Sequence, residues 1–152
     1  MRKALRSAGV ALALSALLSA AGVAAGGPAS AATDCWGSGG AHTDYLGNTY
    51  GTAYCNAYTS GSVRASGATR GTLYAGNSWF VCQEQWVGYN NPKVGSAENN
   101  WWLYTQADTS NGDGYHGWGW FPVTKISGGA NWGKVTGLRE CGTIPIFAFP
   151  TP

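Results

Sequence analysis

Charged side chains are scarce in this sequence of 152 residues: only 11% are Asp, Glu, Lys or Arg, and there are two histidines and one methionine. It contains no run of Lys and Arg and no basic stripe. The long-range attraction to phosphate on which nucleic-acid-binding proteins depend is therefore missing. No apolar stretch is long enough to span a bilayer. We expect neither nucleic acid nor an anionic membrane as a partner, and no transmembrane anchor.

The first 31 residues have the pattern of a signal peptide. Arg2, Lys3 and Arg6 precede an apolar stretch at 8–18, and residues 29–31 are the small Ala-Ser-Ala that a signal peptidase cleaves. The pattern predicts a secreted, extracellular protein that begins near residue 32. Without the leader, six Lys and Arg stand against seven Asp and Glu, so the apparent basicity of the chain belongs to the leader.

Helical patterning is also missing, because no amphipathic stretch of ten or more residues follows the leader. Short alternating or aromatic runs recur instead between clusters of Gly, Asn and Ser, which predicts an all-β fold. The expected strands are Thr49–Tyr58, Ser62–Arg64, Gly71–Leu73, Trp79–Trp86, Trp101–Gln106 and Gly117–Phe121, with a late one near Lys134–Leu138. The residues at 85–100 break the periodicity and predict a long loop.

The most informative segment is the aromatic pair of strands at 101–106 and 117–121. Between them lies Asn111-Gly112-Asp113-Gly114, whose glycines can supply the positive φ that a hairpin turn requires. We expect an antiparallel hairpin with a tight turn. Eight Trp, eight Tyr and four Phe compensate for the small number of Leu, Ile and Met in the core.

The four cysteines all follow the leader, and no Cys-x-x-Cys spacing is present, which disfavours a zinc site. An even number of cysteines in an exported chain indicates two disulfides. Three pairings are possible. We favour Cys35 with Cys55, which closes a short N-terminal segment, and Cys82 with Cys141, which ties the C-terminal region back to the fold.

Five segments in order resemble the bacterial Src-homology-3-type domains of secreted and cell-wall proteins, especially small actinobacterial ones. They are Val63–Gly67, Gly71–Asn77, Trp79–Cys82, Trp102–Tyr104 and Gly119–Ile126. The resemblance covers about residues 59–128, and it implies a small SH3-like β-barrel that ends in a single 3₁₀ turn. It implies association with the cell wall only loosely, because one fold serves many functions.

The expected organisation follows from these segments. Residues 1–31 form the signal peptide, 32–58 a disulfide-tethered N-terminal β extension, 59–128 the barrel, and 129–152 a late strand with an irregular, Pro-containing tail. The tail at 144–152 is apolar and Pro-spaced, so we expect it to dock on its own barrel or on another molecule.

A candidate recognition surface follows from strand alternation and from the abundance of aromatic residues. We expect only one face of the 117–121 strand to be core, with Trp120 as a core residue and Trp118 either buried or exposed. Trp and Tyr dominate binding hot spots. The candidate ligand-binding residues are Tyr89, Trp101, Tyr104, Tyr115 and Trp118. The alternative is that these rings merely cover a small core.

Catalytic and metal-binding constellations are weak. His42 and His116 are the only imidazoles, and every cysteine is expected to be oxidised, so Cys-His catalysis is disfavoured. The carboxylates that a glycosidase would require lie at turns and strand ends: Glu84, Glu98, Asp108 and Asp113. The segment at 108–114 lacks the calcium-loop spacing. We therefore expect no catalysis, no metal and no cofactor.

The function predicted from the sequence is a secreted, non-catalytic module that binds a peptide or a cell-wall glycopeptide through an aromatic surface. The alternative is a secreted inhibitor or toxin whose tail at 144–152 occupies the cleft of a secreted protein partner. The two functions differ in which part of the chain makes the contact.

Overall fold

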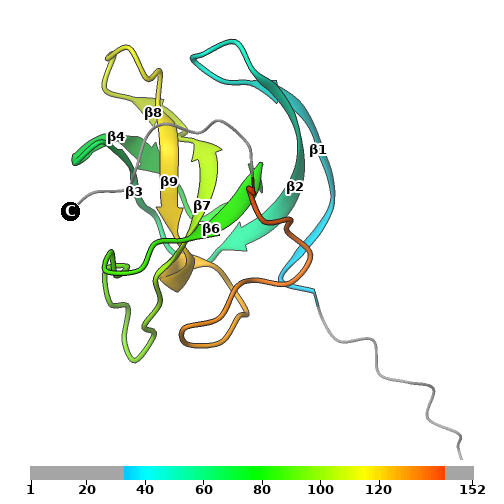
Figure 1. The fold of residues 1–152 in the computed structure, drawn as a ribbon, viewed down its shortest axis with the longest axis vertical. Coiled ribbons are helices and arrows are strands. Elements are labelled where there is room, and N and C mark those ends of the chain that lie inside the picture. The colour runs from blue at the N-terminus through cyan, green and yellow to red at the C-terminus, as the bar shows by residue number, and fades with distance from the viewer. Residues whose placement is uncertain (1–32, 143–152) are drawn as a thin grey trace, which may run out of the picture. The chain divides into compact units, whose positions relative to one another are not determined.

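The computed structural model describes residues 33–142, and this part of the chain is all-β (Figure 1). It contains no α-helix, and its single helical turn is the 3₁₀ turn η1, Val123–Lys125. The strands are β1 Cys35–Thr43, β2 Thr49–Ala57, β3 Gly61–Ala65, β4 Ala68–Leu73, β5 Gly76–Phe80, β6 Cys82–Gln85, β7 Trp101–Gln106, β8 Thr109–Ser110 and β9 Trp118–Pro122. Within this range, no helix has the length and hydropathy to cross a membrane. The predicted signal peptide and the apolar tail lie outside the described residues.

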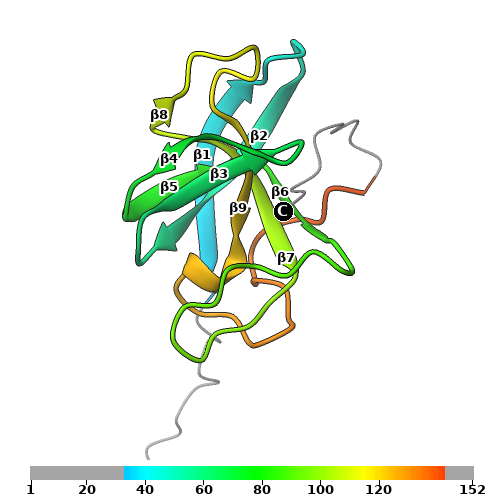
Figure 2. The ribbon, with the colours of Figure 1, turned by 90° about the vertical axis from the view of Figure 1, so that its left-hand side faces the viewer.

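The strands form two sheets (Figures 1 and 2). The smaller sheet has the order β1-β2-β5, and the larger has the order β6-β7-β9-β3-β4-β8. Only Val81 separates β5 from β6, so one extended segment passes from the smaller sheet into the larger. Neither sheet closes on itself, since β1 and β5 end one and β6 and β8 end the other. The predicted all-β class is confirmed, whereas a closed barrel is not established.

Most of the predicted strands are present. The strand at 101–106 has the predicted limits, and the strand predicted at 79–86 is divided at Val81 into β5 and β6. Two strands were not predicted from the sequence: β8, which has only two residues, and β1, which is rich in glycine. Gly37 and Gly40 in β1 have φ of 61° and 87°, and the pairing with β2 is irregular between Trp36 and Gly40. A bulged glycine strand lacks the alternation that identifies a strand in a sequence.

The aromatic strands β7 and β9 pair antiparallel, as predicted, with Leu103 opposite Phe121. The expected tight turn between them is wrong. The connection covers residues 107–117 and includes β8, which pairs with β4. Gly112 has φ of 78° and Gly117 has φ of 83°, so positive φ occurs here but in a wider loop.

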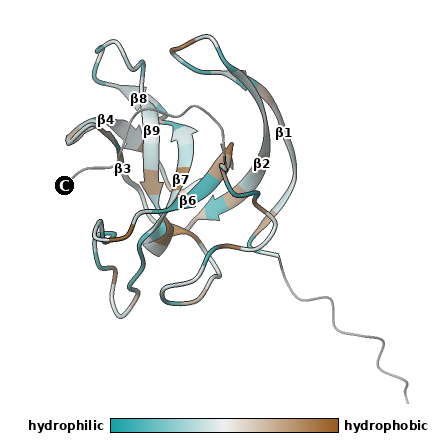
Figure 3. Cartoon of the chain, viewed as in Figure 1, coloured by the Kyte–Doolittle hydropathy of each residue, from teal (hydrophilic) through white to brown (hydrophobic). Residues whose placement is uncertain are grey.

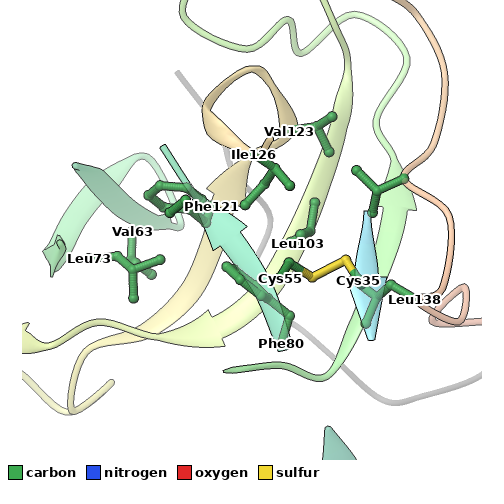
Figure 4. Packing of buried hydrophobic residues seen from close by; sticks show 12 residues of the cluster. Cys35, Cys55, Val63, Leu73, Phe80, Leu103, Phe121, Val123, Ile126 and Leu138 are labelled. Atoms are coloured by element: carbon green, nitrogen blue, oxygen red, sulfur yellow. A yellow bond between two sulfur atoms is a disulfide. The ribbon is translucent and has the colours of Figure 1, made fainter. Parts of the chain in front are cut away.

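Both faces of the β7–β9 pair are buried, so the expectation that only one face is core is wrong. On one face, Leu103 and Phe121 pack with Val63, Leu73 and Phe80, together with the Cys35–Cys55 disulfide; we name this the Leu103 core (Figure 4). On the other face lies the Trp118 core, whose members are Tyr50, Val81, Cys82, Trp102, Tyr104, Trp118, Trp120 and Cys141. Much of β9 is pale in Figure 3, because Trp and Gly rank near the middle of the hydropathy scale although every residue of β9 is buried.

The two favoured disulfide pairings are confirmed. Cys35 bonds Cys55 directly across β1 and β2, with a sequence separation of 20, and Cys82 bonds Cys141 with a separation of 59. On the chain-entropy account, loops of these lengths correspond to about 3 and about 4 kcal/mol of stabilisation. No free cysteine occurs among the described residues.

The late strand expected near Lys134–Leu138 is wrong, because a buried side chain takes the place of a strand partner. Gln83 is fully buried, and its Nε2 donates to the carbonyl oxygens of Val135 at 2.8 Å and Leu138 at 2.6 Å. Its Oε1 accepts from the backbone N–H of Val135 at 2.9 Å. These bonds hold residues 135–138 against β6 without a ladder.

Candidate functional site

A groove lies where the long loop between β6 and β7 folds back over the start of β7. The loop is closed at its base by the Trp86 N–H, which donates to the Asn100 carbonyl at 2.9 Å, and higher up by the Asn91 N–H, which donates to the Asn99 carbonyl at 2.7 Å. Trp102 Nε1 donates to the Tyr89 carbonyl at 2.9 Å and so fixes the loop over the indole. Of the adjacent tryptophans at 101 and 102, Trp102 is thus the one that lies under this loop.

The groove consists of two adjoining hollows that share Arg64, Pro92 and Trp102. We name it the loop groove. The first hollow, of about 300 Å³, is completed by the loop residues 88–91, and the second, of about 380 Å³, by Ser60, Gly61, Ser62, Pro122 and Lys125. Aromatic and proline surfaces thus alternate with backbone and hydroxyl groups along it.

The charged side chains that line the loop groove are all positive. Arg64 and Lys125 are the charged residues among those that line the two hollows, and no carboxylate is among them. Lys125 Nζ donates to the Ser60 carbonyl at 2.8 Å, and its side chain runs close over Gly61, where an added Cβ would lie 2.5 Å from Lys125 Cδ. The glycine lets the lysine lie flat along the groove and keeps its ammonium group at the rim.

Asn91 is the most unusual polar group of the loop groove. Its side chain is 5% exposed, and its Oδ1 accepts from the Thr124 N–H at 3.1 Å, which fixes which end of the amide is oxygen. The buried Nδ2 has no hydrogen-bond partner within the part of the chain that the structure describes. An unsatisfied buried donor costs about 1–3 kcal/mol, so such a group in a folded protein requires an explanation.

The five residues of the predicted recognition surface do not come together. Tyr104 and Trp118 are 1% and 2% exposed, and their ring centroids lie 5.3 Å apart in the Trp118 core. The prediction that Tyr104 and Trp118 contact a ligand is therefore corrected. Neither ring is open to a ligand, because the second face of the β7–β9 pair is also buried. Trp101 is partly buried against the Leu103 core. Tyr89 is the one of the five that lines the loop groove, and its binding role stays a prediction.

Tyr115, the remaining member, has its ring engaged by other residues. The Arg70 guanidinium lies 3.8 Å from the ring centroid, and the Tyr45 ring packs beside it at 4.8 Å. Arg70 also donates to the Ala65 carbonyl and to Asp113 Oδ2, the latter at 2.9 Å. This hydrogen bond from Arg70 lowers the pKa of Asp113 below its ordinary value. The cluster holds the 107–117 connection against β4.

The carboxylates considered for catalysis are dispersed. Glu98 pairs with Lys93, Asp113 pairs with Arg70, and Asp108 Oδ2 accepts the Tyr74 N–H at 2.6 Å. The pKa of Glu84 is raised, mainly by burial and further by the nearby Glu140. Among residues 33–142, no three His, Cys, Asp or Glu side chains are grouped to hold a metal ion.

A buried carboxylate and two tyrosines close the β1–β2 end of the Trp118 core. Asp44 accepts from the Tyr50 hydroxyl at 3.1 Å and from the backbone N–H groups of Leu46 and Asn48, both at 2.9 Å. Burial, followed by the hydrogen bond to Asp44, raises the pKa of Tyr50 from 10.0 to about 12. Burial and the charge of Asp44 also raise the pKa of Tyr104.

These shifts predict alkaline unfolding. A phenol whose pKa is higher in the folded protein favours folding fully below its unfolded pKa of 10.0, and that contribution is lost as the pH rises towards about 12. We expect the free energy of unfolding, measured with denaturant, to be flat up to pH 9 and to fall between pH 10 and 12. The Tyr50→Phe variant, which cannot ionise there, should show a shallower fall. An equal slope in the two proteins would contradict this assignment.

Several residues of the loop groove were not predicted from the sequence. Arg64 and Trp102 lie within segments that resemble the Src-homology-3-type family, but their meeting depends on β3 and β7 both pairing with β9. Pro92 and Asn91 were assigned to a loop without a role. The available signal was the loop itself, since long loops often border binding surfaces.

No protein-family model matches this chain, and neither a curated protein nor a solved structure is significantly similar to it. The functional argument therefore depends on the residues of the site alone.

Proposed function

We propose that this chain is a secreted, non-catalytic binding module that recognises a peptide or a cell-wall glycopeptide in the loop groove. The observation that carries the proposal is the composition of the groove: the exposed Tyr89 ring and Pro92, set against the largely buried Trp102 and Pro122, lie beside two cations and no carboxylate. Aromatic and proline surfaces bind apolar peptide side chains, and cations at the rim favour a ligand that carries carboxylates. Two disulfides are compatible with an extracellular protein.

Asn91 supplies the specificity in this proposal. We propose that the loop that carries Asn91 shifts on binding, because its Nδ2 is buried in the described structure; a peptide carbonyl in the first hollow would then accept from this unsatisfied donor. Apolar contacts alone would not select a polypeptide backbone, whereas a fixed donor beside a cation does.

The fold relation is part of the same proposal. We propose that β3, β4, β7 and β9 correspond to an SH3-like barrel to which β1 and β2 are added as an extension through β5. Two features support this relation: the single 3₁₀ turn at Val123–Lys125 directly after β9, and the antiparallel pairing of β9 with both β7 and β3. The barrel would explain why the groove residues converge from distant parts of the sequence.

The binding proposal is tested by retention of the purified mature protein on insoluble peptidoglycan at low and high salt. We expect retention that weakens, but does not vanish, at high salt, because ring contacts persist when charge is screened. Tyr89→Ala should reduce the affinity about fivefold or more, and Lys125→Gln should reduce its salt dependence.

Matched controls separate the groove from the rest of the surface. Tyr74→Ala removes an exposed ring elsewhere, and Lys134→Gln removes an exposed lysine that pairs with Glu140. Both should bind peptidoglycan as the wild type does. Absence of retention at either salt concentration, or equal retention of Tyr89→Ala, would exclude the loop groove as the binding site.

The alternative function places the contact in the tail. The described residues end at Gly142, one residue after Cys141, whose disulfide to Cys82 belongs to the Trp118 core. We propose in this alternative that residues 144–152 enter a partner's cleft, as in an inhibitor or toxin. A variant that ends at Gly142 distinguishes the two: loss of protease inhibition or killing supports the tail, and unchanged wall binding supports the groove.

A further inference from the structure

A second set of aromatic side chains lies on the face of the β1–β2–β5 sheet opposite the Leu103 core, and none of them lines the loop groove. Cys35 and Cys55 are directly opposite each other on β1 and β2, and their disulfide belongs to the Leu103 core. Trp36 and Tyr54 are the next opposed pair. Because successive side chains of a strand point to opposite faces, burial of the disulfide places Trp36 and Tyr54 together on the face opposite the Leu103 core. Tyr50, on the same face of β2, belongs to the Trp118 core, whereas Trp36 and Tyr54 are exposed.

The row continues onto the third strand. Tyr54 is opposite Trp79 of β5, so Trp36, Tyr54 and Trp79 stand side by side on three adjacent strands. Trp79 is partly buried: it stacks on His42, with ring centroids 3.7 Å apart, and packs on Trp118 at 5.4 Å. It therefore anchors the row to the Trp118 core, while Trp36 and Tyr54 remain 42% and 36% exposed.

A pair of amides lies beside this row on the same face. Asn56 and Asn77 are opposed on β2 and β5, two residues from Tyr54 and Trp79 respectively. Asn56 Nδ2 donates to Asn77 Oδ1 at 2.9 Å, and Asn56 Oδ1 accepts from the Ser127 hydroxyl at 2.7 Å. These bonds fix the orientation of both amides, and Asn77 is exposed. We name Trp36, Tyr54, Asn56 and Asn77 the outer platform.

The outer platform has the chemistry of a sugar-binding surface. We propose that it binds a neutral, β-linked polysaccharide, with the faces of successive sugar rings on Trp36 and Tyr54 and sugar hydroxyls on the Asn77 amide. Pyranose rings present apolar C–H faces and polar hydroxyl edges, and the platform offers rings and amides in that relation. Adjacent strands are about 4.8 Å apart, which is close to the length that one sugar unit adds to a β-linked chain.

Two observations argue against a charged ligand or a strand of another molecule at the outer platform: the platform lacks charge, and the edge strand β1 is irregular. The platform has no charged side chain, unlike the loop groove, so it lacks the complementarity that an acidic or basic ligand requires. Pairing of β1 with a strand of another molecule is hindered by the irregularity between Trp36 and Gly40, because bulges protect edge strands from such pairing. A neutral glycan requires neither feature.

The test is affinity electrophoresis of the full mature protein in native gels that contain hydroxyethylcellulose or glycol chitin, at low and high salt. We expect retardation in at least one gel that does not change with salt, since no charge is involved. The double variant W36A/Y54A should lose the affinity at least tenfold, and Asn77→Ala should lose it severalfold. The matched control W132A/Y74A removes an exposed Trp and an exposed Tyr elsewhere and should be retarded as the wild type is.

Each other outcome overturns the proposal. Absence of retardation in both gels, or equal retardation of W36A/Y54A when circular dichroism shows it folded, removes the glycan site. A wild type that sediments as a dimer, with W36A/Y54A as a monomer, would make this face a self-interface instead. The proposal does not rest on the loop groove: Tyr89→Ala should keep its retardation in neutral gels, so the two sites can fail separately.

Discussion

Replacing Gln83 with Met is expected to lower the free energy of unfolding by about 4 kcal/mol, because buried groups that lose their only partner each cost about 1–3 kcal/mol. The substitution conserves length and volume but deprives the Val135 N–H and the Val135 and Leu138 carbonyls of the side-chain amide. Denaturant unfolding measures the change, and hydrogen exchange should show lost protection at 133–141.

Gln85→Met is the matched control for this prediction. Gln85 belongs to the same strand but is exposed, and its amide donates only to Asn100 Oδ1, at 3.2 Å. A change within about 0.5 kcal/mol is expected for such a surface site. If the two variants are equally stable, the Gln83 amide does not hold the C-terminal segment, and the Cys82–Cys141 disulfide and the backbone hydrogen bonds of Gln83 with Arg139 and Cys141 hold it instead.

Replacing Gly119 with Ala is expected to destabilise the protein by about 3 kcal/mol or to prevent folding, since overpacking against main chain cannot be relieved by a side-chain movement. An added Cβ would lie 2.5 Å from the Arg64 carbonyl oxygen and 2.9 Å from its carbon. Strands β3 and β9 meet at Arg64 and Trp120, next to this glycine. The clash would push β3 away from β9. This separation would disrupt the wall of the loop groove.

Gly51→Ala provides the comparison. Gly51 also lies in a strand, and a Cβ added there meets nothing within 4 Å. It should be neutral or slightly stabilising, because alanine restricts the unfolded chain more than glycine does. Thermal melts of the two variants give the difference directly, and a Gly119→Ala protein as stable as Gly51→Ala would contradict the close approach of β3 and β9.

The local sequence pattern predicted those strands that are rich in aromatic or β-branched residues or that alternate clearly. β7 and β2 have runs of aromatic, β-branched and alternating residues, and both were predicted to within one residue. Of the three possible disulfide pairings, the one favoured from the sequence is present. By contrast, β1 is interrupted by glycines with positive φ, and residues 135–138 are held by a side chain 52 positions away. The glycines remove the alternation that identifies a strand, and a contact between residues so far apart cannot be inferred from a short segment of sequence.

The candidate sites were less predictable than the strands. Tyr104 and Trp118 have the composition of a hot spot, yet they are buried because the β1–β2 hairpin and the Cys82–Cys141 disulfide contribute to a second core over β7 and β9. Alternation along a strand tells which side chains share a face, but not whether that face meets solvent. The same rule, applied once the disulfide was known to be buried, places Trp36 and Tyr54 on the face opposite the Leu103 core, and only the packing shows that these two rings are exposed.

The sequence by itself determined that this chain forms short strands and that its two aromatic strands pair antiparallel, because these properties follow from residues close together in the chain; it favoured the disulfide pairing that the structure confirms. The tertiary structure alone decided which rings are covered, and it brought Arg64, Trp102 and Lys125 into one groove. The physical reason is that exposure and charge complementarity depend on packing between distant segments, and such packing leaves no periodic trace in the sequence.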